Sequence, residues 1–126
     1  MLSSAQITET VHAYLAAINA GDMQAVMALY ADNAAVEDPA GTEPKRGADI
    51  LEFYTNAFAG GASVELTGAI GVSSRTAAFP FRAEIKSPAG SVTIVEVIDI
   101  FEFNEDGKVE KMTAHFGPTN MSQRED

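Results

Sequence analysis

The chain has 126 residues and carries 8 Lys plus Arg against 18 Asp plus Glu, so its formal net charge is −10. A chain of this length predicts one domain around a single core. The acidic charge disfavours nucleic acids and anionic membrane surfaces as partners, and the absence of cysteine excludes disulfides and thiolate chemistry.

The N-terminal residues lack the basic stretch and the following apolar run that mark a secretory signal. No apolar stretch approaches the roughly 20 residues that a membrane-spanning helix needs. We therefore expect a cytoplasmic protein without a membrane partner.

The first half of the chain predicts three helices, with a short strand between the second and the third. The first helix begins at Ser3 or Ser4, stops at Gly21 and has apolar positions at Ile7, Val11, Tyr14, Leu15 and Ile18. Asp22 caps a shorter helix whose inner side carries Met23, Val26, Met27 and Tyr30. Residues 34–39 form the strand, and after the loop 41–47 the third helix carries Ile50, Leu51, Tyr54 and Phe58.

From Ala62 onward the apolar residues recur at every second position, which indicates strands. The expected strands begin at Val64 and continue over residues 79–85, 91–103 and 109–116, with turns at 87–90 and 104–108. The polar tail, residues 119–126, should be loose. Helices followed by strands predict an α+β domain over residues 1–126, with the three helices packed in the concavity of a curved antiparallel or mixed sheet.

Two polar side chains fall where the pattern demands apolar ones. Tyr14 lies within the apolar stripe of the first helix, so its hydroxyl is expected inside the core. An ordinary tyrosine bonded to a backbone carbonyl would give the same pattern. Asp99 lies on a strand face whose other members are Val95, Val97, Phe101 and Phe103.

On such a face an isolated carboxyl group keeps its proton, and the protonated form is a hydrogen-bond donor. The alternative for Asp99 is a solvated face or a pairing with Lys or Arg. Asp38 is a third polar group, placed at the end of the short strand just before Pro39. The proline biases Asp38 toward an extended backbone, and access to solvent keeps its carboxylate ionised and able to act as a base.

An ordinary turn aspartate is the alternative for Asp38. Taken together, Tyr14, Asp38 and Asp99 are titratable groups whose surroundings favour different protonation states. Acid–base enzymes bring together groups of this kind.

The opposite face of the longest predicted strand is mixed. Its members are Ile94, Glu96, Ile98, Ile100 and Glu102. Because an apolar patch is costly as bare surface, we expect a homodimer through the outer face of the sheet.

Several segments carry a family resemblance: Tyr14 with residues 16–22, then residues 36–39, 41–44, 52–54, 98–99, 107–109 and 116–117. Through these segments, from about residue 8 to residue 120, the chain resembles bacterial ketosteroid isomerase (steroid delta-isomerase). This SnoaL-like family has the cone-shaped fold named after nuclear transport factor two. The resemblance implies that Asp38 is the base and that Tyr14 and neutral Asp99 form the oxyanion hole.

The implied reaction moves a C=C bond of an unconjugated 3-oxosteroid into conjugation, through a dienolate, by intramolecular proton transfer. Neither a coenzyme nor a metal is expected. The resemblance also implies a hydrogen-bond chain behind Tyr14 and a pocket for the steroid. The residues expected to bind the substrate are Ile18, Tyr30, Phe53, Tyr54, Val64, Phe81, Val97, Met112, Ala114 and Phe116.

Two other functions remain open at this point. Another SnoaL-like enzyme, such as a polyketide cyclase, would also use an aspartate as base, and a non-catalytic module would bind an apolar ligand. The neutral Asp99 opposite Tyr14 favours the isomerase. His115 departs from the family pattern and is expected at the surface or a subunit interface, and His12 should be solvated.

Overall fold

Helix α1 spans Ser4–Ala20 in the computed structural model, which describes residues 2–125. Ser3 caps the helix: its hydroxyl accepts from the backbone N–H of Gln6, and the Gln6 side chain accepts from the backbone N–H of Ser3. Gly21 ends the helix in the left-handed region, at a φ of 70°. The two ends of the predicted domain, Met1 and Asp126, lie outside the described residues.

The next two helices are short. Helix α2 spans Met23–Met27 and is capped by the Asp22 side chain, which accepts from the backbone N–H of Ala25. Helix α3 spans Ala48–Ala57. The prediction that Tyr30 belongs to the second helix is wrong, because strand β1 begins at Tyr30, where the backbone pairs with another strand.

Eight strands form one curved sheet in the order β2-β1-β7-β6-β5-β3, with β4 paired to β5 and β8 paired to β6. The strands are β1 (Tyr30–Glu37), β2 (Lys45–Arg46), β3 (Ala62–Leu66), β4 (Gly71–Ser73), β5 (Thr76–Lys86), β6 (Ser91–Phe103), β7 (Val109–His115) and β8 (Met121–Glu125). Strand β1 runs parallel to β7 and every other pairing is antiparallel, so the sheet is mixed. A 3₁₀ turn, Pro118–Asn120, links β7 to β8.

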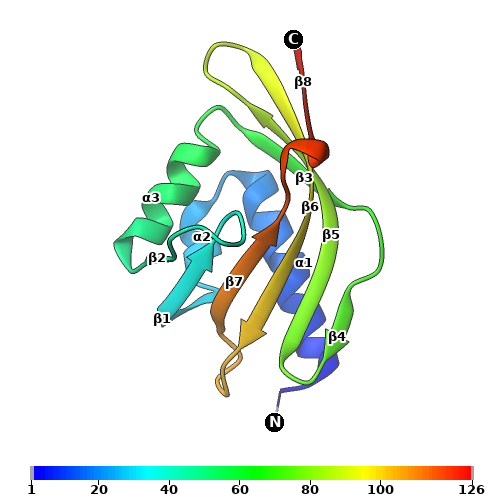
Figure 1. The fold of residues 1–126 in the computed structure, drawn as a ribbon. Coiled ribbons are helices and arrows are strands. Elements are labelled where there is room, and N and C mark those ends of the chain that lie inside the picture. Colours follow the sequence, from blue (N-terminus) through cyan, green and yellow to red (C-terminus); the bar gives the residue numbers. More distant parts are fainter. Residues whose placement is uncertain (1, 126) are drawn as a thin grey trace.

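The helices lie on one side of this sheet, and α1 runs behind β5 and β6 (Figure 1). Alternating residues of β5 and β6 point inward and pack on α1. Among them Phe79 and Phe101 are fully buried, and their rings contact the ring of Tyr14 at centroid distances of 6.2 and 5.0 Å. The predicted α+β class, with three helices in the concavity of a curved sheet, is confirmed.

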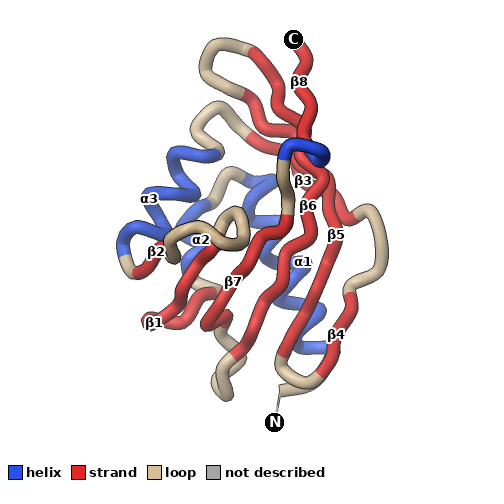
Figure 2. The backbone as a smooth tube through the Cα atoms, in the orientation of Figure 1, coloured by secondary structure: helices blue, strands red, loops and turns tan. Residues whose placement is uncertain are grey.

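The C-terminal tail is a strand, and the prediction that residues 119–126 are loose is wrong for its described part. Strand β8 pairs with the first half of β6, from Ser91 to Val95, while β7 pairs with the second half, from Ile98 to Phe103. Figure 2 shows this strand rising beside the hairpin of β5 and β6. The long β6 leaves backbone donors and acceptors free beyond the end of β7, and the tail satisfies them.

The outer face of the sheet is mixed in character, as expected. Ile98 is 48% exposed, and Ile94 and Ile100 are less exposed than Ile98 but not fully buried. His115 is exposed and lies opposite Ile98 in the β6–β7 register, and His12 is exposed on α1. Across residues 2–125, no helix has the length and apolar character that crossing a bilayer requires.

Candidate active site

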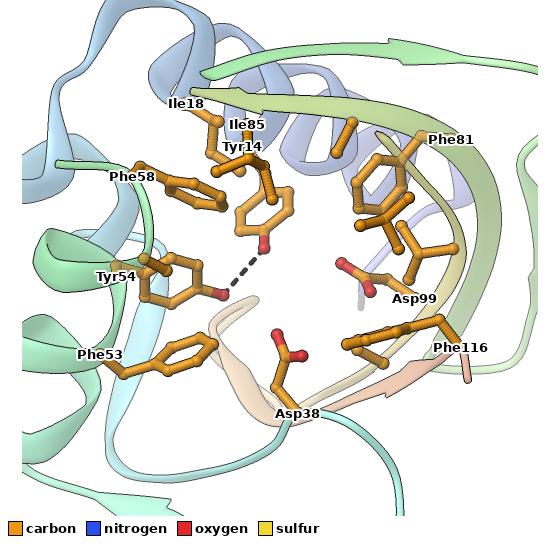
Figure 3. A pocket seen from close by; sticks show the side chains of 15 residues that line it. Tyr14, Ile18, Asp38, Phe53, Tyr54, Phe58, Phe81, Ile85, Asp99 and Phe116 are labelled. Carbon is orange, nitrogen blue, oxygen red and sulfur yellow. Dashed lines mark hydrogen bonds between the residues drawn. The ribbon is translucent and has the colours of Figure 1, made fainter. Parts of the chain in front are cut away.

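A cavity of about 230 Å³ lies between α1, α3 and the inner face of the sheet (Figure 3). Its polar side chains are those of Tyr14, Tyr54, Asp38 and Asp99. The rest of the wall is apolar and consists of Ile18, Phe53, Ala57, Phe58, Phe81, Ala83, Ile85, Val95, Val97, Ala114 and Phe116. Figure 3 shows the Tyr14 hydroxyl and the carboxyl groups of Asp38 and Asp99 directed into the same space.

Tyr14 reaches the cavity from the apolar stripe of α1 and is 2% exposed. Its hydroxyl forms a 2.8 Å hydrogen bond with that of Tyr54 from α3, which in turn bonds the hydroxyl of Tyr30 at 2.6 Å. Burial, followed by the charge of Asp99, raises the pKa of Tyr14 well above its usual value of 10.0. The Tyr14 phenol is therefore neutral and can donate a hydrogen bond into the cavity.

Asp99 enters from the middle of β6 and is 1% exposed. No Lys or Arg among residues 2–125 lies within ion-pair distance of it, so neither alternative, a solvated face or a pairing with Lys or Arg, applies to Asp99. Burial raises the pKa of Asp99 well above 3.8, the charge of Asp38 adds to this, and the Tyr14 hydroxyl opposes it. These surroundings favour the protonated form of the Asp99 carboxyl group, which can donate a hydrogen bond.

Asp38 follows the last residue of β1 and is half-buried. The turn behind it is fixed by three contacts: Ala40 N–H donates to the Ala114 carbonyl at 2.7 Å, Thr42 donates to the Pro39 carbonyl at 2.8 Å, and Gly41 N–H donates to the Glu37 carboxylate at 3.1 Å. These bonds hold the Asp38 backbone against β7, whose Ala114 lines the same cavity.

The surroundings also raise the pKa of Asp38, but they leave its carboxylate mostly ionised at neutral pH. Burial raises the pKa of Asp38 from 3.8 to about 6, and the nearby charge of Lys45 opposes the rise. At neutral pH the carboxylate is mostly ionised, yet it is far more basic than an ordinary aspartate. One cavity thus holds a mostly ionised carboxylate, a neutral phenol and a carboxyl group whose surroundings favour its protonated form.

Three of the predicted substrate-binding residues do not line this cavity. The Tyr30 hydroxyl bonds Tyr54 but does not reach the cavity. Met112 of β7 is fully buried and pairs with Phe101 of β6, and Val64 packs in the core. The structure places the other predicted substrate-binding residues in the wall: Ile18, Phe53, Tyr54, Phe81, Val97, Ala114 and Phe116.

Five wall residues were not predicted from the sequence. Four of them continue a pattern that the sequence shows: Phe58 follows Tyr54 at helical spacing, Ala83 and Ile85 share the face of Phe81, and Val95 shares the face of Val97. The fifth, Ala57, closes the end of α3. Within residues 2–125, no cluster of three or more His, Cys, Asp or Glu side chains is arranged to hold a metal ion.

Comparison with known proteins gives the family. A family model described as a SnoaL-like domain matches residues 11–112. A steroid delta-isomerase of Nocardioides simplex is 38% identical over 120 residues, which cover 94% of this chain and 95% of that protein. The chain belongs to the steroid delta-isomerase family.

A solved structure supports the same architecture for this family member. The epoxide hydrolase/cyclase-like enzyme SalBIII, described for pyran ring formation in the polyether salinomycin, superposes with a TM-score of 0.89 over 97% of this chain and 98% of its own. At 23% identity this similarity concerns the fold alone. The cone-shaped fold of nuclear transport factor two, expected from the resemblance, is confirmed for this steroid delta-isomerase homologue.

Proposed function

We propose that this protein isomerises an unconjugated 3-oxosteroid to its conjugated isomer, without a coenzyme, through a dienolate. One observation carries the proposal: the side chains of Asp38, Tyr14 and Asp99 point into one cavity whose remaining wall is mostly apolar. In the proposed reaction Asp38 is ionised, and Tyr14 and Asp99 are neutral donors. The family relationship to a steroid delta-isomerase supports the same reaction.

Asp38 is the proposed base. Its carboxylate removes the proton from the carbon between the carbonyl and the double bond, which gives the dienolate and protonated Asp38. The same carboxyl group then returns the proton to the gamma carbon, so the C=C bond moves into conjugation and the enzyme is restored. A pKa of about 6 suits both steps, because the group is ionised at neutral pH and basic enough to accept the proton.

Tyr14 and Asp99 are the proposed oxyanion hole. Both are neutral and uncommitted on their cavity side, so each can donate directly to the oxygen that becomes negative in the dienolate. Since Tyr14 donates to the substrate, Tyr54 must donate to Tyr14 and Tyr30 to Tyr54, and this common direction strengthens each bond. Loss of one oxyanion donor typically costs about 2.7–4 kcal/mol of transition-state stabilisation.

The apolar wall accounts for binding of the rest of the substrate. Aromatic rings from three elements surround the reacting groups: Phe53 and Phe58 from the α3 region, Phe81 from β5, and Phe116 after β7. A rigid hydrocarbon ring system gains free energy by leaving water for such a wall. Excluding water also strengthens the hydrogen bonds to the developing oxyanion.

The test is direct. The purified protein is mixed with an unconjugated 3-oxosteroid, and growth of conjugated-enone absorbance in the ultraviolet is expected. The Asp38→Asn variant should lose about 10²–10⁴-fold in kcat, the usual contribution of a general base, while still binding a phenolic steroid that imitates the dienolate. A wild-type protein that binds the steroid but shows no turnover would contradict the proposed reaction.

We also propose a homodimer through the outer face of the sheet. Ile98 is 48% exposed at the centre of that face, and Ile94 and Ile100 flank it on β6. A second copy of this chain is the proposed occupant, because a symmetric pairing would remove all three isoleucines from water at once.

A further inference from the structure

Lys45 is a cation held near the cavity without a carboxylate partner. It lies on β2, opposite Val36 of β1 and so two residues before Asp38 along that strand. Its ammonium nitrogen is 4.6 Å from the centroid of the Phe53 ring, and within the described residues no carboxylate lies at ion-pair distance from it. A cation over an aromatic face is attracted by the electron-rich ring, which gives Lys45 a defined position.

The ring of Phe53 connects Lys45 with the active cavity. Phe53 lines the cavity together with Asp38, and it also lines a surface hollow together with Lys45. The other members of the hollow are Asp49, Glu52, Asn56 and Ala57. Phe53 is thus shared by the hollow that contains Lys45 and the cavity that contains Asp38.

This inference rests on the proposed function. We propose that Lys45, held on the ring of Phe53, is the positive charge that keeps Asp38 ionised without pairing with it, and so sets the lower pH limit of the isomerase. Lys45 is a positioning residue in this role, since it acts on Asp38 and does not touch the substrate.

Among residues 2–125, no Lys or Arg lines the cavity together with Asp38. The titratable groups that surround it are Tyr14 from α1, Tyr54 from α3 and Asp99 from β6, and none of these can supply a positive charge. The wall residues from β7 and beyond, Ala114 and Phe116, are uncharged.

The charged groups next to Asp38 on β1 and in the hollow of Lys45 do not line the cavity. Glu37 points to the other side of β1, where its carboxylate lies 3.5 Å from the Lys111 ammonium. Asp49 and Glu52 line the surface hollow together with Lys45. The charge of Lys45 lowers the pKa of Asp38, against the larger effect of burial, which raises it.

The absence of a direct ion pair between Lys45 and Asp38 matters for the chemistry of the base. A direct ion pair would occupy the lone pairs of Asp38 and lower its pKa by 1–3 units, so the carboxylate would be a poor base. A cation behind an aromatic ring stabilises the negative charge at a distance and leaves both carboxylate oxygens free for the substrate proton.

The experiment compares kcat/KM against pH, with an uncharged steroid ketone at low ionic strength, in wild type, Lys45→Met, Lys45→Gln, Lys45→Arg and Arg46→Met. Arg46 is the matched control, because it is the next residue of β2 and is exposed. For Lys45→Met and Lys45→Gln, we expect the acid limb of the profile to move to higher pH, with a loss of about threefold or more at pH 5 and a smaller loss at pH 8. Lys45→Arg and Arg46→Met should keep the wild-type profile.

A ¹³C NMR titration of the Asp38 carboxyl group in the same variants gives a readout that does not depend on turnover. Its midpoint should rise when Lys45 loses its charge. Unchanged midpoints in both uncharged variants, or an equal shift in Arg46→Met, would overturn the inference. If wild type shows no turnover, the proposed reaction fails, while the NMR midpoints still decide whether Lys45 acts on Asp38.

Discussion

The hydroxyl oxygens of Tyr14 and Tyr54 lie 2.8 Å apart, although the two residues are separated by 40 positions in the chain. Helix α1 supplies the donor proposed to face the substrate, and α3 supplies the group that orients it. Tyr54 also bonds the Tyr30 hydroxyl, so a mutation of Tyr54 removes a hydrogen bond from both Tyr14 and Tyr30.

Replacing Tyr54 by Phe is expected to lower kcat by about tenfold or less, with little change in KM. The reason is that Tyr14 keeps its own hydroxyl and loses only the bond that orients it, which is worth about 0.5–1.5 kcal/mol. Steady-state kinetics with Tyr30→Phe, one step further from the cavity, provide the control and should show a smaller loss. Equal losses in both variants would contradict the proposal that the bond from Tyr54 orients the Tyr14 hydroxyl.

Glu37 is expected to position the base next to it. Its carboxylate accepts from Gly41 N–H and pairs with Lys111, which lowers its pKa, first through the Gly41 bond. Glu37→Ala frees the turn that holds Asp38 and should reduce kcat, by up to about 100-fold if the base moves by about 1 Å. Lys111→Met keeps the Gly41 bond and is the control; it should lose much less activity in the same assay.

Asp99 is expected to make stability depend on pH in an unusual direction. Its pKa is raised in the folded state, so its contribution to stability is complete below 3.8 and is lost as pH rises. The side chain of the Asp99→Asn variant cannot ionise. The difference in unfolding free energy between this variant and wild type, measured in urea, should therefore grow in favour of the variant from pH 4 upward and still be growing beyond pH 7.

Asp38→Asn is the control for that series. The folded-state pKa of Asp38 is about 6, so the difference between this variant and wild type should stop growing near pH 6. If the Asp99→Asn difference also levels off there, Asp99 is ionised at neutral pH and does not donate as proposed.

Ile98→Glu is expected to convert the proposed dimer to monomers. The substitution places a charge at the most exposed apolar position of the outer face and adds to a net charge of −10 per chain. Size-exclusion chromatography with light scattering should show the smaller mass. Met121→Glu makes the same chemical change at a side chain that is 44% exposed on β8, and this variant should remain dimeric. A wild-type chain that is monomeric at micromolar concentration would rule out the dimer.

Much of the fold follows from periodicity in the sequence. The alternation in residues 91–103 gives β6 its true limits and identifies Asp99 as a carboxyl group on an apolar face. Strand β8 was missed because Met121–Glu125 has no apolar alternation. It is a strand because β6 is longer than β7 and leaves backbone groups to be paired, which is a property of the sheet and not of the tail.

In the candidate site, too, some features follow from sequence periodicity and others depend on how the elements pack together. The sequence pattern identifies Tyr14 and Asp99 as polar groups on apolar faces, since each interrupts a regular period. It does not identify the contact of Lys45 with Phe53, because that contact depends on how β2 lies against α3. Tyr30, Val64 and Met112 lie outside the cavity wall because their side chains pack in the core.

All the hydrogen-bonding groups of the cavity belong to the reacting end, and the remaining wall offers only hydrocarbon surface. Such a wall has no means of recognising hydroxyl or keto substituents on the far rings, and it discriminates a single methylene by only about 1–3 kcal/mol. Related ketones should therefore compete with one another for this enzyme, and selection among them will depend mainly on their shape and on which of them the cell supplies.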